Sequence, residues 1–542
     1  MKLDWLQQLI ILPVLLPLLC GALLILINES RRRFKFIVSL SSLLVQLIIA
    51  ATLVYLSDSA YWENNLGIYL AANWSAPFGI ALVLDRLAAM MLLLTAVLAI
   101  AALWYSTMRW SRIGVHFHSL FQFLLMGING AFLTHDLFNL FVFFEVMLAA
   151  SYGLVLHGYN TVRIRAGMQY IAVNLAASLL FLIGLALIYA GAGTLNMTDV
   201  AARMHGIGAD DLVLLKIGMS ILVIAFLVKS AMWPLGFWLP TTYAASSPPV
   251  AALLVLMTKV GAYVILRLWL LIFVANESVA VGFGLPVLLW GGMITIAFGA
   301  AGMLASQSPG RMAGYAAIIS SGILLAVVGY GQASLITAAL YYLVGSTLAM
   351  AAFVLLIELV ERSRSPGANM LALTMEAFAI EDKPEETVGV GIPGALAFLG
   401  LAFACCAMMI AGLPPLSGFI AKFSLFHTLL HPDAPTVAIT STTWLLMALI
   451  VLSGLAAIIS LMRFGVRTFW ASGTMVAPNL HVTEVAPISA LLVLCVALTV
   501  QAGPVFDYLQ RTSDDLHRPA HYITKVLSAP TVPNVAPEGA LP

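Results

Sequence analysis

Long apolar runs separated by short polar loops dominate the pattern of hydrophobic and polar positions along this chain. Most runs hold about 20 residues or more, enough for a helix to cross the ~30 Å hydrocarbon core of a bilayer. The pattern therefore predicts an all-α polytopic membrane protein with about 14 transmembrane helices. The predicted spans are residues 8–27, 37–56, 78–104, 117–134, 136–157, 166–190, 211–239, 249–273, 283–304, 311–330, 335–360, 388–430, 439–462 and 486–504.

Two of these spans, 211–239 and 388–430, are interrupted by proline. A broken helix is tolerated at membrane depth only inside protein or beside water, because lipid offers no partner to a freed backbone group. The string KSAMWPLGFWLP in the first resembles MIAGLPPLSGFIAKFSLF (409–426) in the second, and such paired breaks are typical of transporters built from repeated bundles. The prolines at the breaks are Pro234, Pro240, Pro414 and Pro415.

Composition excludes several classes of function. With 62% hydrophobic and 9% charged residues and a mean hydropathy of +1.02, the chain is no soluble domain, and its net charge of +1 indicates no nucleic-acid surface. The four cysteines lie in apolar runs without CxxC spacing, which predicts neither an iron–sulfur site nor a disulfide framework. Because it shows no nucleotide loop and no histidine cluster, the sequence predicts no cofactor and no metal.

Lysine and arginine alternate strongly between successive loops. The positive-inside rule places the richer loops in the cytoplasm and hence both chain ends outside. The segment 361–387 is an acidic loop, read as a solvated loop or a docking surface, and the chain from 512 onward is predicted to be disordered. The richer set holds Arg31, Arg32, Arg33, Lys35, Arg109, Arg112, Arg163, Arg165, Arg311, Arg362, Arg364, Lys383, Arg463 and Arg467, and the poorer set holds Lys2, Arg203, Arg511, Arg518 and Lys525.

Four ionisable residues lie deep within apolar sequence, namely Glu145, Lys229, Lys259 and Lys422. Such residues usually mark an ion path, and a desolvated lysine near a carboxylate can exchange protons near neutral pH. A proton relay is therefore predicted. The alternatives are a buried salt bridge that only locks helices, a lysine that snorkels to the interface, or a polar face shared by Lys259 and Arg267.

Asp85 and Arg86 are adjacent at the predicted start of a span. We interpret them as a structural pair rather than as part of the relay.

Four strings carry a resemblance to a known family: HDLFNLFVFFEVMLAASYGLV (135–155), GTLNMTDVA (193–201), KSAMWPLGFWLPTTYAASSPPVAALL (229–254) and AGLPPLSGFIAKFSLF (411–426). They resemble the D-type subunit of the Mrp-type monovalent cation/proton antiporters, in the superfamily of antiporter-like membrane subunits of respiratory complex I. The resemblance covers nearly the whole chain except the extreme tail.

The resemblance implies two inverted five-helix repeats, each with a broken helix. It implies that Glu145 pairs with Lys229 and that Lys259 and Lys422 continue the relay. The implied divisions are flanking helices in 1–116, a first repeat in 117–275, a second in 276–470 and a last transmembrane helix in 471–504. The composition of residues 505–542 predicts a polar disordered tail.

The chain departs from the superfamily in the eleventh span. Ser346 and Met350 stand where many relatives have histidine and lysine, and Ser321 stands where complex I relatives often have histidine. The central relay is therefore expected to depend on water and on hydroxyl groups, as in the proteobacterial Pha-type variant of the D-type subunit. The hydroxyl groups are those of Ser321, Tyr341, Tyr342, Ser346 and Thr347.

The resemblance implies a subunit of a hetero-oligomeric antiporter in the bacterial inner membrane, with other Mrp/Pha subunits as partners. It would provide the proton path that drives efflux of Na⁺ or K⁺. The alternative is a proton-translocating subunit of a redox-driven complex, either a complex I-like NADH dehydrogenase or a membrane-bound hydrogenase. Another alternative is a scaffold that seals its neighbours without conducting.

Overall fold

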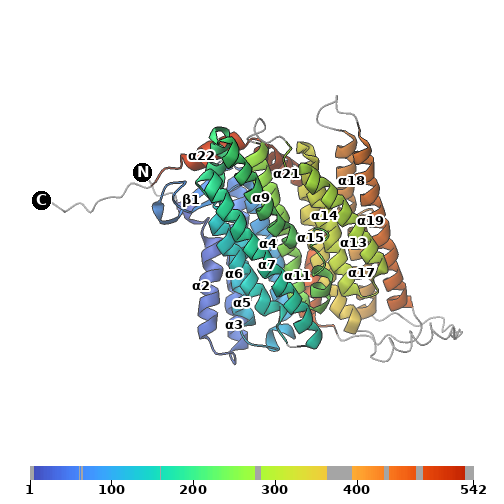
Figure 1. The fold of residues 1–542 in the computed structure, drawn as a ribbon. Helices are drawn as coiled ribbons and strands as arrows, with labels where there is room; N and C mark the ends of the chain where they lie inside the picture. Colours follow the sequence, from blue (N-terminus) through green and yellow to red (C-terminus); the bar gives the residue numbers. More distant parts are fainter. Residues whose placement is uncertain are drawn as a thin grey trace, which may run out of the picture.

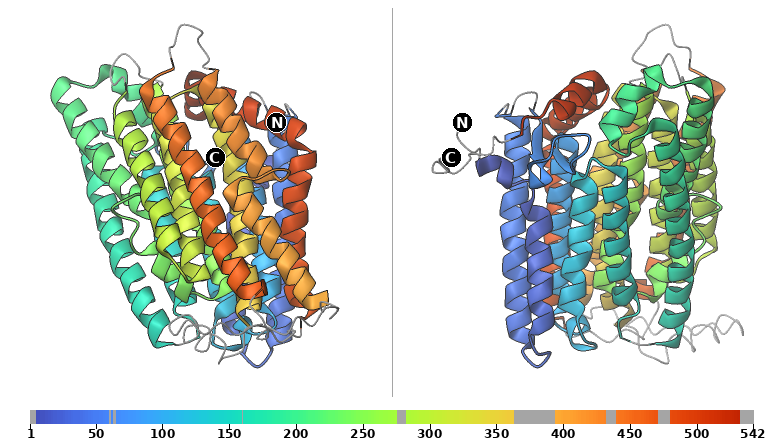
Figure 2. Two further views of the ribbon diagram at one scale, coloured as in Figure 1. Left: turned by 90° about the vertical axis from the view of Figure 1, so that its right-hand side faces the viewer. Right: turned by 60° about the vertical axis from the view of Figure 1, so that its left-hand side comes forward.

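The chain folds into a bundle of helices that run between two opposite ends (Figure 1). The computed structural model describes residues 5–59, 61–62, 65–158, 160–274, 282–362, 394–431, 439–470 and 480–531. We call one end the α22 end, after helix α22 (Pro519–Leu527), and the other the α2–α3 end, where α2 turns into α3. Figure 2 shows from two further sides that the C-terminal helices lie across the α22 end.

The described residues contain twelve helices long and apolar enough to cross a membrane, and two shorter apolar helices, α2 (Leu12–Leu26) and α5 (Phe117–Leu133). Together these fourteen helices match the fourteen predicted spans one for one. Each of the two broken spans is represented by the helix before its break, α9 or α17. The long helices are α3 (Arg32–Asp58), α4 (Arg86–Ser106), α6 (Leu137–Val155), α7 (Thr161–Ala192), α9 (Ala209–Lys229), α11 (Pro248–Leu268), α13 (Leu285–Ala305), α14 (Pro309–Tyr330), α15 (Ala333–Arg362), α17 (Gly394–Ala411), α19 (Ser441–Gly465) and α20 (Val482–Val500).

Both predicted breaks are real. The first separates α9 from α10 (Leu239–Ala245), and the second separates α17 from α18 (Ser417–Leu430). Helix α10 packs against α7 and α14, while α18 packs against α15. Helix α11 lies between the two halves of the bundle, against α4, α9, α14 and α15. Its apolar stretch is wholly buried, which makes α11 the axis of the core.

The predicted span 78–104 begins too early. Residues Gly67–Leu70 (β1) and Ala81–Leu84 (β2) form an antiparallel hairpin, with Gly67 opposite Leu84 and Leu70 opposite Ala81. Helix α4 starts only after Asp85, whose side chain caps it by accepting a hydrogen bond from the Ala88 N–H. The apolar run continues through this boundary, so hydropathy alone cannot separate the strand from the helix.

The expectation of a disordered tail in 505–542 is wrong for the described part. Two helices occupy it, α21 (Ala502–Leu516) and α22. Two short helices from earlier in the chain, α1 (Trp5–Gln8) and α8 (Met197–Arg203), also lie at the α22 end. In α21, Leu509, Thr512, Ser513 and Leu516 are buried at helical spacing. The overall polarity of the tail concealed this narrow apolar face. Residues 532–542 and most of the acidic loop 361–387 lie outside the described residues.

Candidate functional site: a chain of buried lysines

The first break is built around Lys229, the last residue of α9. The chain leaves the helix through Ala231, whose φ of 55° is unusual for a residue other than glycine. The Trp233 N–H, which no longer has a helical acceptor, donates to Thr295 Oγ1 of α13 at 3.0 Å. The Trp238 indole donates at 3.3 Å to the Val228 carbonyl, which also accepts from the Ala231 N–H. The broken backbone is therefore satisfied within protein, as the membrane requires.

The second break has the same construction. Gly412, at φ 82°, ends α17 before Pro414 and Pro415. In both breaks a glycine lies so close to the backbone before the break that no side chain would fit. A Cβ on Gly236 would lie 2.2 Å from the Ala231 carbonyl oxygen, and a Cβ on Gly418 would lie 2.0 Å from the Met409 carbonyl oxygen. The repeated "GF" in the two strings thus reflects a shared close approach.

The two lysines are not equivalent, however. Lys229 ends the first half-helix of its broken span, whereas Lys422 lies within α18, the second half-helix of the other. The Lys422 ammonium donates to the Ala411 carbonyl at 2.9 Å, across the break. It therefore satisfies a carbonyl that the interrupted helix leaves without a partner.

Glu145 and Lys229 face α7 rather than each other. Glu145 accepts a hydrogen bond from Ser178, and Lys229 donates to Asn174. No ion pair joins the two within the described residues. Because Asn174 and Ser178 are four residues apart, they lie on one face of α7. A single helical turn of neutral groups therefore stands between the carboxylate and the amine.

Lys259 is completely buried on α11, and its ammonium donates to Ser320 Oγ of α14 at 2.5 Å. Ser320 in turn lies 3.2 Å from Ser346 Oγ of α15. Ser346 and Tyr342 line a small cavity of about 30 Å³ that also contacts Lys422. This volume holds about one or two water molecules. The hydroxyl groups and the cavity connect Lys259 with the second broken helix.

The structure separates the predicted hydroxyl groups into two sets. Ser346 and Tyr342 lie on the connection. Tyr341 points away and donates to the Leu498 carbonyl at 3.0 Å, and Thr347 donates to the Leu343 carbonyl of its own helix. The Ser321 hydroxyl is buried without a partner among the described residues. Its neighbour Ser320, and not Ser321, accepts the hydrogen bond from Lys259.

Three contributing residues escaped the sequence argument: Asn174, Ser178 and Ser320. A signal for the first two existed, because Tyr170, Asn174 and Ser178 form a polar stripe at four-residue spacing within the otherwise apolar stretch 170–188. No such signal distinguishes Ser320 from Ser321, since adjacent residues on a helix point about 100° apart and the sequence does not give the rotation of α14.

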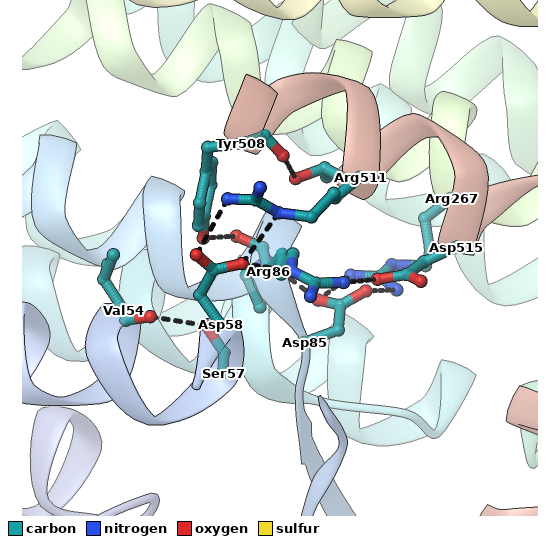
Figure 3. A network of polar contacts seen from close by, with 11 residues as sticks. Val54, Ser57, Asp58, Asp85, Arg86, Arg267, Tyr508, Arg511 and Asp515 are labelled. Atoms are coloured by element: carbon teal, nitrogen blue, oxygen red, sulfur yellow. Dashed lines mark hydrogen bonds and ion pairs between the residues drawn. The ribbon is translucent and has the colours of Figure 1, made fainter. Parts of the chain in front are cut away.

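Asp85 and Arg86 are not a pair, contrary to the expectation from their adjacency. Asp85 accepts two hydrogen bonds from Arg267 of α11, at 2.5 and 2.8 Å. Arg86 binds Asp58 at 2.8 Å and Asp515 of α21 at 2.5 Å, within the network of Figure 3. Burial alone would raise the pKa of the Asp85 carboxyl, but Arg267 and the Ala88 N–H hold this pKa below its usual value.

Comparison with known proteins supplies the family. Residues 134–448, more than half of the chain, match the model of the family described as "NADH:quinone oxidoreductase/Mrp antiporter, TM". The chain belongs to this family. This NADH:quinone oxidoreductase/Mrp antiporter segment includes Glu145, Lys229, Lys259 and Lys422.

Relatives of the Mrp antiporter type align with nearly the full chain. A probable K⁺/H⁺ antiporter subunit of the D type from Rhizobium meliloti is 54% identical, over 97% of this chain and 99% of the relative. A Na⁺/H⁺ antiporter subunit of the same type from Alkalihalophilus pseudofirmus is 32% identical, over 96% and 99%. A chain in the structure of the Mrp complex from Dietzia sp. DQ12-45-1b is similar with a TM-score of 0.80 and 26% identity, covering 97% of this chain and all of that one.

Proposed function

We propose that this chain is the D-type subunit of a multi-subunit cation/proton antiporter and carries a transmembrane proton path that drives efflux of Na⁺ or K⁺. The observation that carries the proposal is the connection from Lys259 through Ser320 and Ser346 to the cavity beside Lys422. Glu145 and Lys229 form the first part of the same relay. The relatives support a transporter, and they favour it over a redox-driven pump.

The proposed partners are the other Mrp/Pha subunits, and the proposed location is the bacterial inner membrane. The excess of arginine and lysine at the α2–α3 end supports an orientation in which this end faces the cytoplasm. At the α22 end, Arg86 and Arg267 are neutralised by aspartates. The basic residues of the α2–α3 end are Arg31, Arg32, Arg33, Lys35, Arg109, Arg112, Arg163, Arg165, Arg311, Arg362, Arg463 and Arg467.

The roles of the relay residues follow from their contacts. Each lysine donates to a neutral acceptor, namely Asn174, Ser320 or the Ala411 carbonyl. A lysine so placed can lose its proton without abandoning a buried carboxylate, which suits a site that must alternate between two protonation states. The prolines 234, 240, 414 and 415 hold the breaks at which Lys229 and Lys422 stand.

Lys422 provides the test. In everted vesicles that contain the whole complex, Lys422→Ala should abolish cation-dependent recovery of the pH gradient while the complex still assembles. Lys422→Arg should rescue poorly, because a guanidinium hardly deprotonates. Lys216→Ala is the matched control, since Lys216 lies on α9 over the ring of Phe283, away from this connection. Normal exchange by Lys422→Ala would refute the proposed path.

A further inference from the structure

Helix α11 carries a stripe of three buried polar side chains: Lys259, Tyr263 and Arg267. They are spaced four residues apart and so lie on one face of the helix. The only other polar side chain on α11 that is not at an end is Thr258, which donates to the backbone of its own helix. The stripe leads from the middle of the bundle to the α22 end.

Two large cavities meet α11, one near each of its ends. A cavity of about 310 Å³ at the α2–α3 end is lined by Ala251 of α11, Tyr243 of α10 and Glu358 of α15. A cavity of about 290 Å³ at the α22 end is lined by Arg267 and by Tyr522 of α22. Lys259 lies eight residues from Ala251 and eight from Arg267, roughly 12 Å along the helix in each direction.

The two approaches to Lys259 differ in their hydrogen bonding. At the α2–α3 end, the hydroxyl groups of Ser246 and Ser247 are buried without a partner among the described residues. Ser246 lines the cavity there. Such groups are free to bind water that enters the cavity. This side of Lys259 is therefore suited to proton entry.

Toward the α22 end, both polar groups of the stripe, Tyr263 and Arg267, are bound by other protein groups. Arg267 donates to both Asp85 oxygens and to the Tyr263 hydroxyl at 2.9 Å. The Tyr263 hydroxyl donates its own proton to the Phe132 carbonyl at 2.7 Å. The ring of Tyr522 covers the guanidinium, with 5.7 Å between the guanidinium carbon and the ring centroid. A buried ion pair whose donors and acceptors are already bound thus stands between the cavity and Lys259, and it leaves no group of the stripe free to pass a proton to Lys259.

We propose that the Asp85–Arg267 pair, covered by Tyr522, is an outer seal on α11. It prevents a proton that reaches Lys259 from the cytoplasmic cavity from leaving directly at the α22 end. The proton must instead continue through Ser320 and Ser346 toward Lys422. This inference rests on the proposed function, and it assigns to the pair a role in coupling rather than in carrying protons.

The test measures passive proton leak through the purified complex in liposomes, without Na⁺ or K⁺. The double variant Asp85→Asn with Arg267→Met removes the seal without leaving one buried charge uncompensated. It should raise the leak about tenfold or more, because neutral groups then line the way to Lys259. Arg267→Lys keeps the positive charge and should leak no more than the native complex.

A matched control comes from a self-contained ion pair at the same end. Asp199→Asn with Arg203→Met removes a pair within α8, outside the stripe on α11. This variant should not leak. An equal leak from both double variants would show general loosening of the α22 end and would overturn the seal.

Two further measurements decide the matter if the first double variant does not assemble. Tyr522→Leu leaves all charges in place but uncovers the guanidinium, and a leak about two- to fivefold above native is expected. A cysteine placed by Tyr263→Cys should react with an impermeant thiol reagent from outside only when the seal is also altered. If neither variant leaks or is labelled, while the complex still exchanges cations for protons, the proposed seal is wrong and the proposed function stands. Absence of exchange by the native complex would instead overturn the proposed function.

Discussion

The three lysines proposed for the relay are bound by neutral groups. Lys229 donates to an amide oxygen, Lys259 to a hydroxyl and Lys422 to a backbone carbonyl. Direct ion pairs are used instead at the α22 end, where Arg267 and Arg86 bind aspartates. An arginine–aspartate pair is a fixed structure, because the guanidinium keeps its proton. A lysine on a neutral acceptor can change its charge.

The relation between Glu145 and Lys229 can be tested by removing both charges. The double variant Glu145→Gln with Lys229→Met should assemble, because no buried charge is left uncompensated, but exchange should fall by about a hundredfold or more because no titratable group remains in the first part of the relay. Complex yield and vesicle exchange measure the two effects separately. Full exchange at native complex levels would mean that the pair only locks helices.

At the scale of elements, helices α21 and α22 fasten the α22 end. Arg511 and Asp515 of α21 reach Asp58 and Arg86, and the Tyr508 hydroxyl donates to the Arg86 carbonyl (Figure 3). Ser513 donates to the Ala333 carbonyl at the start of α15, in the other half of the bundle. These amphipathic helices thus join both halves at one end.

Helix α22 contacts a buried histidine. The Tyr522 hydroxyl lies 3.1 Å from His135 Nδ1, and His135 is buried between α5 and α6. Burial, with Arg267 nearby, lowers the pKa of His135 to about 3, while Asp85 opposes this shift. Neither Arg267, which stays protonated, nor Asp85, whose pKa lies below its usual value, titrates between pH 5 and 7.

Acidification should therefore loosen α22. When α22 leaves, His135 becomes less buried and its pKa rises toward the ordinary value of about 6.5, so the undocked state binds more protons below about pH 6.5. The stability of docking is complete above about pH 6.5 and falls as the pH drops toward about 3. Hydrogen exchange of residues 505–527 should rise between pH 7 and 5, after correction for the intrinsic rate. His135→Gln should remove that dependence, and a dependence unchanged in the variant would contradict the role of His135.

At the scale of the whole molecule, the bundle leaves wide apolar faces uncovered. Only a third of the apolar stretch of α3 and of α7 is buried, and less of that of α20. Lipid can cover these faces, but they also suit contact with other membrane subunits, as in the Mrp complex whose chain this one resembles.

The chain expressed alone is therefore expected to insert without exchanging cations for protons, because the faces proposed for its partners are empty. Cation-dependent pH recovery in everted vesicles, measured with and without the remaining subunits, checks this. Exchange by the isolated chain at the rate of the complex would contradict it.

The sequence alone determined the number of apolar spans, both broken helices and the four ionisable residues within apolar sequence. Each of these depends on a local property: the length of an apolar run, the loss of a hydrogen bond at proline, or a charge among apolar neighbours. The resemblance carried by residues 135–155, 229–254 and 411–426 adds the family, which the comparisons confirm.

Tertiary structure alone decided which polar groups meet. Adjacency suggested a pair of Asp85 with Arg86, but β2 and the start of α4 direct the two side chains to different partners. The rotation of α14 brings Ser320, not Ser321, to Lys259. The helices of the tail form against a bundle surface that exists only once residues hundreds of positions earlier have packed. Partners far apart in sequence are fixed by the relative rotation and depth of whole helices, which no local pattern of residues specifies.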